Sequence, residues 1–134
     1  MTKSDARSDR RRNPRVEARL ALQISERGAK GGPQVAESLN ISTGGVYCLV
    51  KAALPVLTVL DLSIQLPKFG ANKATQVLHC EAVVVRCEKS AKPARGAVVY
   101  DLACAFQNLD DETQGMVNEY VLWKLLRPGT TGNG

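Results

Sequence analysis

The sequence predicts a mainly β domain with six antiparallel strands in a small barrel or sandwich, a C-terminal α-helix, and a flexible basic arm at the N-terminus. Two patterns carry this prediction. Apolar and polar residues alternate in six segments separated by turn residues, and the apolar spacing becomes helical near the end of the chain. With 134 residues, of which 44% are hydrophobic, the chain is large enough for one globular domain with its own core.

The strands are predicted from this alternation, in order along the chain. The first begins at Arg19, where Leu20, Leu22 and Ile24 alternate with polar or small residues, and it ends at the turn "ERGAKGG" (26–32). The second strand is weaker, and its alternate positions on one face are Val35, Glu37, Leu39 and Ile41. The six predicted strands cover residues 19–24, 35–41, 46–50, 59–67, 75–89 and 94–107, and the last two are expected to pair with each other.

The predicted helix covers residues 111–126. Asp110 is a favourable N-cap, and two acidic residues follow it at the positive end of the helix dipole. Tyr120 and Trp123 are expected to be packing residues and not platforms for a ligand. The apolar residues at helical spacing should lie on the barrel, and they are Met116, Val117, Tyr120, Val121 and Leu125.

Positive charge is concentrated at the N-terminus. The formal net charge is +5, and residues 1–19 hold seven Lys or Arg against three Asp or Glu, a local excess of four positive charges. A nucleic-acid-binding module more often spreads its basic residues over one face of the fold, so this pattern favours a mobile basic tip. The chain is therefore divided into a disordered N-terminal arm (1–9), one domain (10–126) and a flexible tail (127–134).

Membrane segments and metal sites are not expected. The N-terminus has no apolar signal-peptide core, and the most apolar stretch, residues 52–60, is short and contains Pro55, so we expect a cytoplasmic protein. The single histidine, His79, stands next to Cys80, but no cysteine pair has C-x-x-C spacing. We expect reduced thiols, mostly buried, and no cofactor, with a zinc site as the alternative. The four cysteines are Cys48, Cys80, Cys87 and Cys104.

Two short motifs stand out from this background. The segment "RRRNPR" (10–15) holds four arginines and precedes the first predicted strand, and "NISTGG" (40–45) ends the second. Taken alone, the first is typical of a solvated basic tail. The second is typical of a tight hairpin turn, in which Gly44 and Gly45 would adopt positive φ. Their occurrence together, at these places in the predicted strand order, favours a binding site over two separate structural features.

In these motifs the chain resembles the PilZ domain family. The resemblance covers residues 10–126 and includes an RxxxR motif, an NxSxxG motif (Asn40, Ser42, Gly45), and "LACAFQNLDDE" before the terminal helix. It implies a six-stranded antiparallel PilZ-like β-barrel that binds the bacterial second messenger cyclic di-GMP, singly or as an intercalated dimer. RxxxR occurs three times, and we take the pair Arg11 and Arg15, because Arg19 lies within the first strand and Arg7 lies far into the arm.

The resemblance also implies roles for the ligand-binding residues. Arg11 and Arg15 would bind phosphates and guanine edges, because the guanidinium fork suits both. Asn40 stands where Asp is more common in the family and would contact a guanine edge, Ser42 would hydrogen-bond nearby, and Gly45, preceded by Gly44, would let the backbone approach the ligand. Arg10, directly before RxxxR, is associated in the family with binding of a stacked pair of nucleotides, so two nucleotides per chain are expected.

The sequence therefore predicts a non-enzymatic cyclic di-GMP receptor that signals when its arm becomes ordered and a partner protein binds. The resemblance implies a partner in a motility, pilus, polysaccharide or transcription pathway. One alternative is a PilZ-like adaptor that binds protein and no nucleotide. Another is a small barrel that binds single-stranded nucleic acid, although six aromatic residues are few for base stacking. A catalytic set of nucleophile, base and orienting group cannot be assembled by spacing around one histidine.

Overall fold

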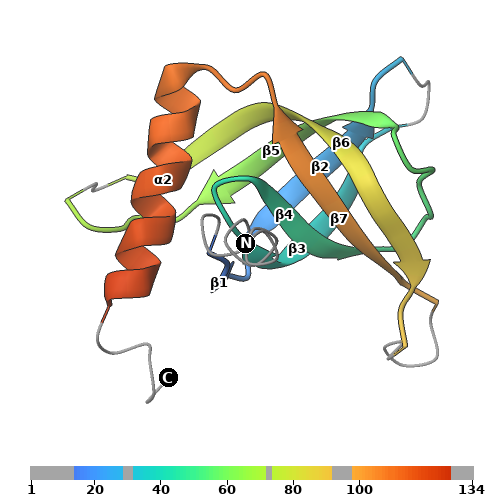
Figure 1. Ribbon diagram of the computed structural model, residues 1–134, viewed down its shortest axis with the longest axis horizontal. Coiled ribbons are helices and arrows are strands. Elements are labelled where there is room, and N and C mark those ends of the chain that lie inside the picture. Colours follow the sequence, from blue (N-terminus) through green and yellow to red (C-terminus); the bar gives the residue numbers. More distant parts are fainter. Residues whose placement is uncertain (1–13, 29–31, 72–73, 92–97, 128–134) are drawn as a thin grey trace, which may run out of the picture.

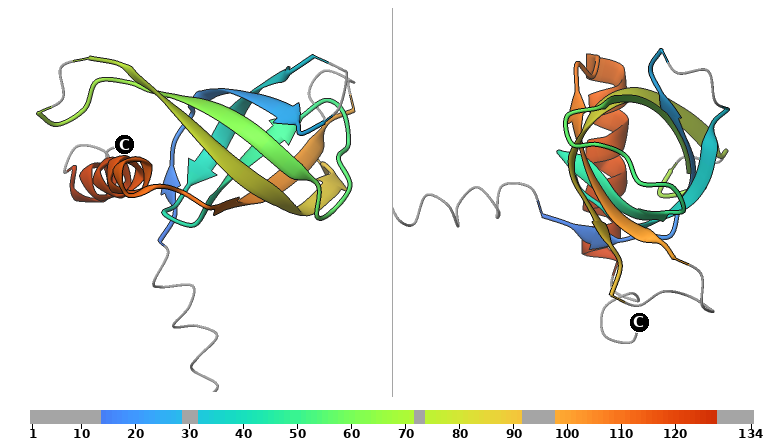
Figure 2. Two further views of the ribbon diagram at one scale, coloured as in Figure 1. Left: turned by 90° about the horizontal axis from the view of Figure 1, so that it is seen from above. Right: turned by 90° about the vertical axis from the view of Figure 1, so that its right-hand side faces the viewer.

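The computed structural model describes residues 14–28, 32–71, 74–91 and 98–127. These residues form a closed barrel of six antiparallel strands, with a short seventh strand outside it and one helix at one end (Figures 1 and 2). The predicted fold class is confirmed, and the choice between barrel and sandwich is settled by the pairing of β3 with β4, which closes the sheet. The elements are β1 (Val16–Glu17), β2 (Ala21–Glu26), β3 (Gln34–Ile41), β4 (Gly45–Val50), β5 (Val59–Leu66), β6 (Gln76–Lys89), β7 (Tyr100–Gln107) and α2 (Asp111–Leu126).

Around the barrel the strands follow the order β3, β2, β5, β6, β7 and β4. β1 pairs with the last two residues of β3, next to the segment where β2 pairs with the same strand. The last predicted strand is shorter than expected, because β7 begins at Tyr100 and not at residue 94. Predicted features that fall on residues 1–13 and 128–134 lie outside the described residues, including the arm, nearly all of the tail, Arg10 and Arg11.

The barrel interior is filled by the inward-facing apolar residues of its strands. At one end, α2 lies across the barrel and packs against β1 and β6 (Figure 2). Val117, Tyr120 and Val121 form its buried side. Phe69, from the connection between β5 and β6, meets the ring of Tyr120 edge-on at 5.2 Å between centroids and that of Trp123 at 5.6 Å. Both aromatic residues of α2 are therefore packing residues, as predicted.

The ends of α2 coincide with the prediction, but one side of the helix does not. The Asp110 carboxylate accepts a hydrogen bond from the Thr113 backbone N–H at 2.7 Å, so the predicted N-cap is confirmed. Leu125 was expected to pack on the barrel, whereas it is 44% exposed. Periodicity alone placed Leu125 with the buried residues, but it is the second-last residue of the helix, and the fold leaves it exposed there.

The inward face of β3 also differs from the expected alternation. Val35 and Glu37 are exposed, while Ser38 is fully buried, so the predicted face is wrong for the first half of the strand. The pairing of β3 with β4 shifts register between Ser38 and Asn40, which leaves Leu39 as a bulge. The bulge reverses the alternation, so Ile41 is buried as expected.

The structure also bears on the expectations for the cysteines, for metal sites and for membrane-spanning segments. All four cysteines are free thiols; Cys48 and Cys104 are buried, and Cys80 and Cys87 are half-buried. No group of three or more His, Cys, Asp or Glu side chains in the described part of the chain could hold a metal ion. In the part of the chain that the structure describes, no helix is long and apolar enough to cross a membrane.

Candidate functional site

A surface groove of about 620 Å³ lies on the outer wall of the barrel, over β3, β4, β7 and β6. This volume is within the range of small-molecule sites. The groove brings together residues from four parts of the chain that are distant in sequence. Its lining includes every predicted site residue that the structure describes, namely Arg15, Asn40, Ser42, Gly44 and Gly45.

The floor of the groove follows one row of paired residues across four strands. Asn40 in β3 pairs with Tyr47 in β4. Tyr47 pairs with Ala103 in β7, and Ala103 pairs with Arg86 in β6. The small side chain of Ala103 leaves open space between the larger residues on either side. The row therefore leaves a hollow at Ala103, with Tyr47 on one side and Arg86 on the other.

Two β-bulges turn the ends of this row toward the groove. Ser38 and Val84 are both fully buried, so regular alternation would also turn inward the residues two positions later, Asn40 and Arg86. The register shift after Ser38 reverses this for Asn40, and a second shift between Val84 and Arg86 does the same in β6. Arg86 and the bulged Val85 are consequently exposed on the outer wall.

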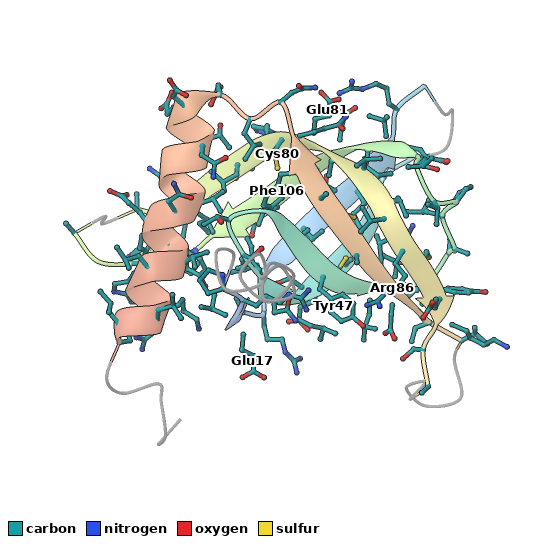
Figure 3. All side chains as sticks on the ribbon, in the orientation of Figure 1. Glu17, Tyr47, Cys80, Glu81, Arg86 and Phe106 are labelled. Atoms are coloured by element: carbon teal, nitrogen blue, oxygen red, sulfur yellow. The ribbon has the colours of Figure 1, made fainter. Side chains whose placement is uncertain are left out.

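Tyr47 and Arg86 face each other across the floor. The guanidinium carbon of Arg86 lies 5.9 Å from the centroid of the Tyr47 ring, at the outer limit of a cation–π contact. Figure 3 shows the two side chains together below β4 and β7, with Glu17 farther toward β1. Both present flat, polarizable faces beside the two predicted motifs.

The turn between β3 and β4 forms one edge of the groove and is fixed by its own hydrogen bonds. The Ser42 hydroxyl accepts from the Gly44 backbone N–H at 3.1 Å, and the Ser42 N–H donates to the Gly45 carbonyl at 2.9 Å. The Gly44 carbonyl accepts from the Phe106 N–H at 2.9 Å, which ties the turn to β7. The contacts described for Ser42 thus lie within the turn, and its buried side chain shapes the edge of the groove.

Gly45 is required for a reason different from the expected one. Within the described residues, the glycines with positive φ are Gly28 and Gly70, so the expectation of positive φ at Gly45 is wrong. A Cβ atom built on Gly45 would instead lie 2.1 Å from the Cys104 carbonyl oxygen. Glycine therefore allows β4 and β7 to approach closely at the edge of the groove.

Arg15 is positioned by the chain that follows it. Val16 is buried in β1, and the segment after β1 is held by Ser38, whose hydroxyl donates to the Ala18 carbonyl and accepts from the Leu20 N–H at 2.8 Å. Arg15 itself is exposed at the groove. Together with backbone hydrogen bonds from the Ala18 N–H to the Leu39 carbonyl and from the Ser38 N–H to the Leu20 carbonyl, the Ser38 hydroxyl fixes the backbone that follows Arg15.

The structure separates Arg15 from Arg19. Arg19 pairs with Glu37 at 3.6 Å and lines a different depression, next to Leu66 and Pro67. Arg19 is therefore not one of the residues that line the groove, and the choice of Arg11 with Arg15 stays a prediction. The partner of Arg15 in that motif, Arg11, lies outside the described residues.

The chain matches the model of one known protein family. The family model of the PilZ domain matches residues 9–123, which is most of the chain. The chain belongs to the PilZ domain family. The matched range, residues 9–123, spans the segments 10–15 and 40–45 and all strands of the barrel. A comparison with curated proteins found no match.

Solved structures share the fold of this PilZ domain. Bacillus subtilis MotI/DgrA, an inhibitor of motility, has a TM-score of 0.70 at 23% identity, over 87% of this chain and 52% of that one. The PilZ domain with c-di-GMP of Escherichia coli YcgR has a TM-score of 0.69 at 14% identity, over 92% and 98%. The K. pneumonia MrkH–c-di-GMP complex has a TM-score of 0.71 at 19% identity, over 93% and 55%. The chain thus spans about half the length of MotI and MrkH.

Sequence analysis of this PilZ domain did not identify Tyr47, Val85 and Arg86 as residues that line the groove. Tyr47 lies two residues after Gly45 on the alternation of β4, so its outward direction could have been found from the motif. Arg86 could not, because local alternation places it with the buried Val84, and only the register of β6 against β7 reveals the bulge.

A second depression, near the start of α2, is a weaker candidate. Its charged residues already satisfy one another: Arg27 forms an ion pair with Asp61 and lies 3.5 Å from Glu81, which also accepts from the Gln107 amide at 2.6 Å. The hydrogen bond from Arg27 lowers the pKa of the Asp61 carboxyl, and the hydrogen bond from Gln107 lowers that of Glu81. These groups therefore stabilise each other more readily than they would bind an anionic ligand.

Proposed function

We propose that this PilZ domain is a receptor for cyclic di-GMP and that the nucleotide binds in the groove over β3, β4, β7 and β6. The observation that carries the proposal is the convergence of Arg15 with Asn40, Ser42, Gly44 and Gly45 around one open groove. The presence of c-di-GMP in the related structures of YcgR and MrkH supports the choice of ligand.

The residue types suit the chemistry of the ligand. A cyclic dinucleotide presents two phosphates and two guanines. Arg15, together with Arg11, would bind phosphate oxygens or the O6/N7 edge of guanine through bidentate hydrogen bonds. Asn40 would contact a guanine edge, while Ser42 and the two glycines would hold the turn close to the ligand. Tyr47 and Arg86 would offer their flat faces to a guanine ring on the groove floor.

The proposed stoichiometry is two nucleotides per chain. A stacked pair of cyclic di-GMP molecules carries four negative charges, and Arg10, Arg11 and Arg15 with Arg86 would provide four guanidinium groups near them. We expect Arg10→Ala to lower the stoichiometry toward one nucleotide. Titration at protein concentrations far above the dissociation constant measures this ratio. A wild-type ratio near one would contradict binding of a stacked pair, but it would not contradict binding of cyclic di-GMP.

Signalling would follow from ordering of residues 10–15 on the bound nucleotide. Ordering this segment costs conformational entropy, which charge-assisted contacts to the phosphates would offset. The nucleotide and the ordered segment would together form a surface for a partner protein in a motility, pilus, polysaccharide or transcription pathway. No catalytic step is part of this proposal.

The arginine register tests the proposal within the chain. Because a charge-assisted hydrogen bond contributes about 1.5–3 kcal/mol, Arg15→Ala and Arg11→Ala should each weaken binding of cyclic di-GMP by about ten- to a hundredfold. Arg19→Ala is the matched control, since Arg19 pairs with Glu37 outside the groove, and Arg7→Ala tests general electrostatics. Binding can be followed by anisotropy of a labelled nucleotide. Equal losses for Arg7, Arg15 and Arg19 would mean that diffuse charge, and not this groove, holds the ligand.

A further inference from the structure

The outward side of α2 carries leucines that the fold does not bury. Leu122, Leu125 and Leu126 are 55%, 44% and 69% exposed. They stand at positions i, i+3 and i+4, which is the spacing of anchor residues in helix-mediated protein recognition. At about 100° per residue, Leu122 and Leu126 point away from the buried Val117, so packing on the barrel does not account for them.

Acidic residues continue the same side toward the start of the helix. Glu112 and Glu119 are exposed, and at about 100° per residue they project close to the direction of Leu126. We call Glu112, Glu119, Leu122 and Leu126 the outer α2 face, which Leu125 borders on the side of the buried Val121. It is acidic in its first half and apolar in its second half. Figures 1 and 2 show α2 at the end of the barrel, with its outer side turned away from the strands.

We propose that the outer α2 face is a docking surface for a partner protein whose contacting helix combines apolar residues with lysine or arginine. The leucines would supply the buried anchors, and the two glutamates would select a basic partner and fix its direction along α2. Contiguous exposed apolar residues rimmed by charge are typical of protein interaction sites.

The charge pattern argues against two other occupants. A second copy of this chain would add two more glutamates to the contact, whereas Lys124, the basic residue of the last turn, projects to the barrel side of α2 and Arg127 stacks on Trp123. An anionic membrane surface would be repelled by the same glutamates. A basic, apolar partner satisfies both halves of the face. The inference rests on α2 alone and stands whether or not the groove binds a nucleotide.

The chain contains its own reporter for this surface. Trp123 is the single tryptophan, and it lies on α2 with Arg127 stacked 4.3 Å from its ring. The probe is a helical peptide of about 18 residues made of leucine and lysine, with leucines at i, i+3, i+4 and i+7 and no aromatic residue. A second peptide has glutamate in place of every lysine. Each is titrated into the full chain while Trp123 fluorescence is recorded, at low and at high salt.

We expect the lysine peptide to bind, more weakly at high salt, and to bind at least about tenfold more tightly than the glutamate peptide. The double variant Leu122→Ser/Leu126→Ser should lose at least about tenfold in affinity for it. Val35→Ser is the matched control, because Val35 is 71% exposed on β3, and it should bind as the wild type does. Glu119→Lys should weaken binding of the lysine peptide and strengthen that of the glutamate peptide, which tests the face even if the double variant does not fold.

Four results would overturn the inference. They are no binding of the lysine peptide, equal binding of the two peptides, equal binding by the wild type and the double leucine variant, and sedimentation of the free chain as a dimer that the leucine variant abolishes. The last result would make a second copy the occupant.

Discussion

Replacing Gly45 with alanine should destabilise the barrel at the edge of the groove. The added Cβ would lie 2.1 Å from the Cys104 carbonyl oxygen, a backbone atom that cannot rotate away. Relief of this contact requires β4 and β7 to separate by on the order of 1 Å, which also strains the neighbouring hydrogen bond from Phe106 to Gly44. Overpacking of this kind costs about 1–3 kcal/mol, or roughly 3 to 15 °C in melting temperature for a domain of this size.

The matched control is Gly115→Ala, in the first half of α2. A Cβ at Gly115 would meet no heavy atom within 4 Å, and alanine favours the helix over glycine by about 0.5–1 kcal/mol. Thermal unfolding followed by far-UV circular dichroism should therefore show opposite signs, with Gly45→Ala melting lower than the wild type and Gly115→Ala melting slightly higher. If Gly45→Ala melted at the wild-type temperature, the close approach of β4 and β7 could not be the reason for glycine at this position.

Three further predictions follow from described contacts. Ser38→Ala should lower the free energy of unfolding by about 1–3 kcal/mol in urea denaturation, because two buried backbone groups lose their partner, whereas Ser63→Ala, at a half-exposed position, should cost much less. Asn40→Ala should weaken nucleotide binding with little change in melting temperature, and a large drop in melting temperature would instead favour a purely structural turn. Burial raises the pKa of Cys48 and of Cys104 from 9.0 to about 12, so the unfolded chain loses these protons first, and stability should fall as pH rises from about 9 to about 12. Urea denaturation at pH 8 and pH 10 should show a smaller loss in the Cys48→Ala/Cys104→Ala double variant, and an equal loss would assign the slope to other groups.

Much of the fold could be predicted because its signals are local. Asp110 begins α2 through a contact three residues away, and the apolar alternation of β5 is regular from Val59 to Leu66. β1 could not be predicted, because two residues are too few to show alternation. The bulges at Leu39 and Val85 could not be predicted either, since a bulge is defined by the register of the neighbouring strand and not by the sequence of its own.

The candidate site divides in the same way. Arg15, Asn40 and Ser42 belong to motifs that are visible in the chain, and the groove contains all three. Arg86 joins them because a bulge turns it outward and because β6 is connected to β3 through β7 and β4 in the sheet. Site residues that are brought to the groove by strand register can therefore be identified only in the structure. Site residues that belong to one turn or motif can be identified in the sequence.

The central claim is that the groove binds cyclic di-GMP, and isothermal titration calorimetry of the wild-type chain tests it most directly. GTP and a short single-stranded oligonucleotide serve as controls for a guanine nucleotide and for a polyanion. We predict saturable heat with cyclic di-GMP, at two nucleotides per chain, and no saturable heat with either control. Saturable heat with the oligonucleotide alone would contradict the claim in favour of a nucleic-acid-binding barrel, and no heat with any of the three would leave a protein adaptor as the function of this domain.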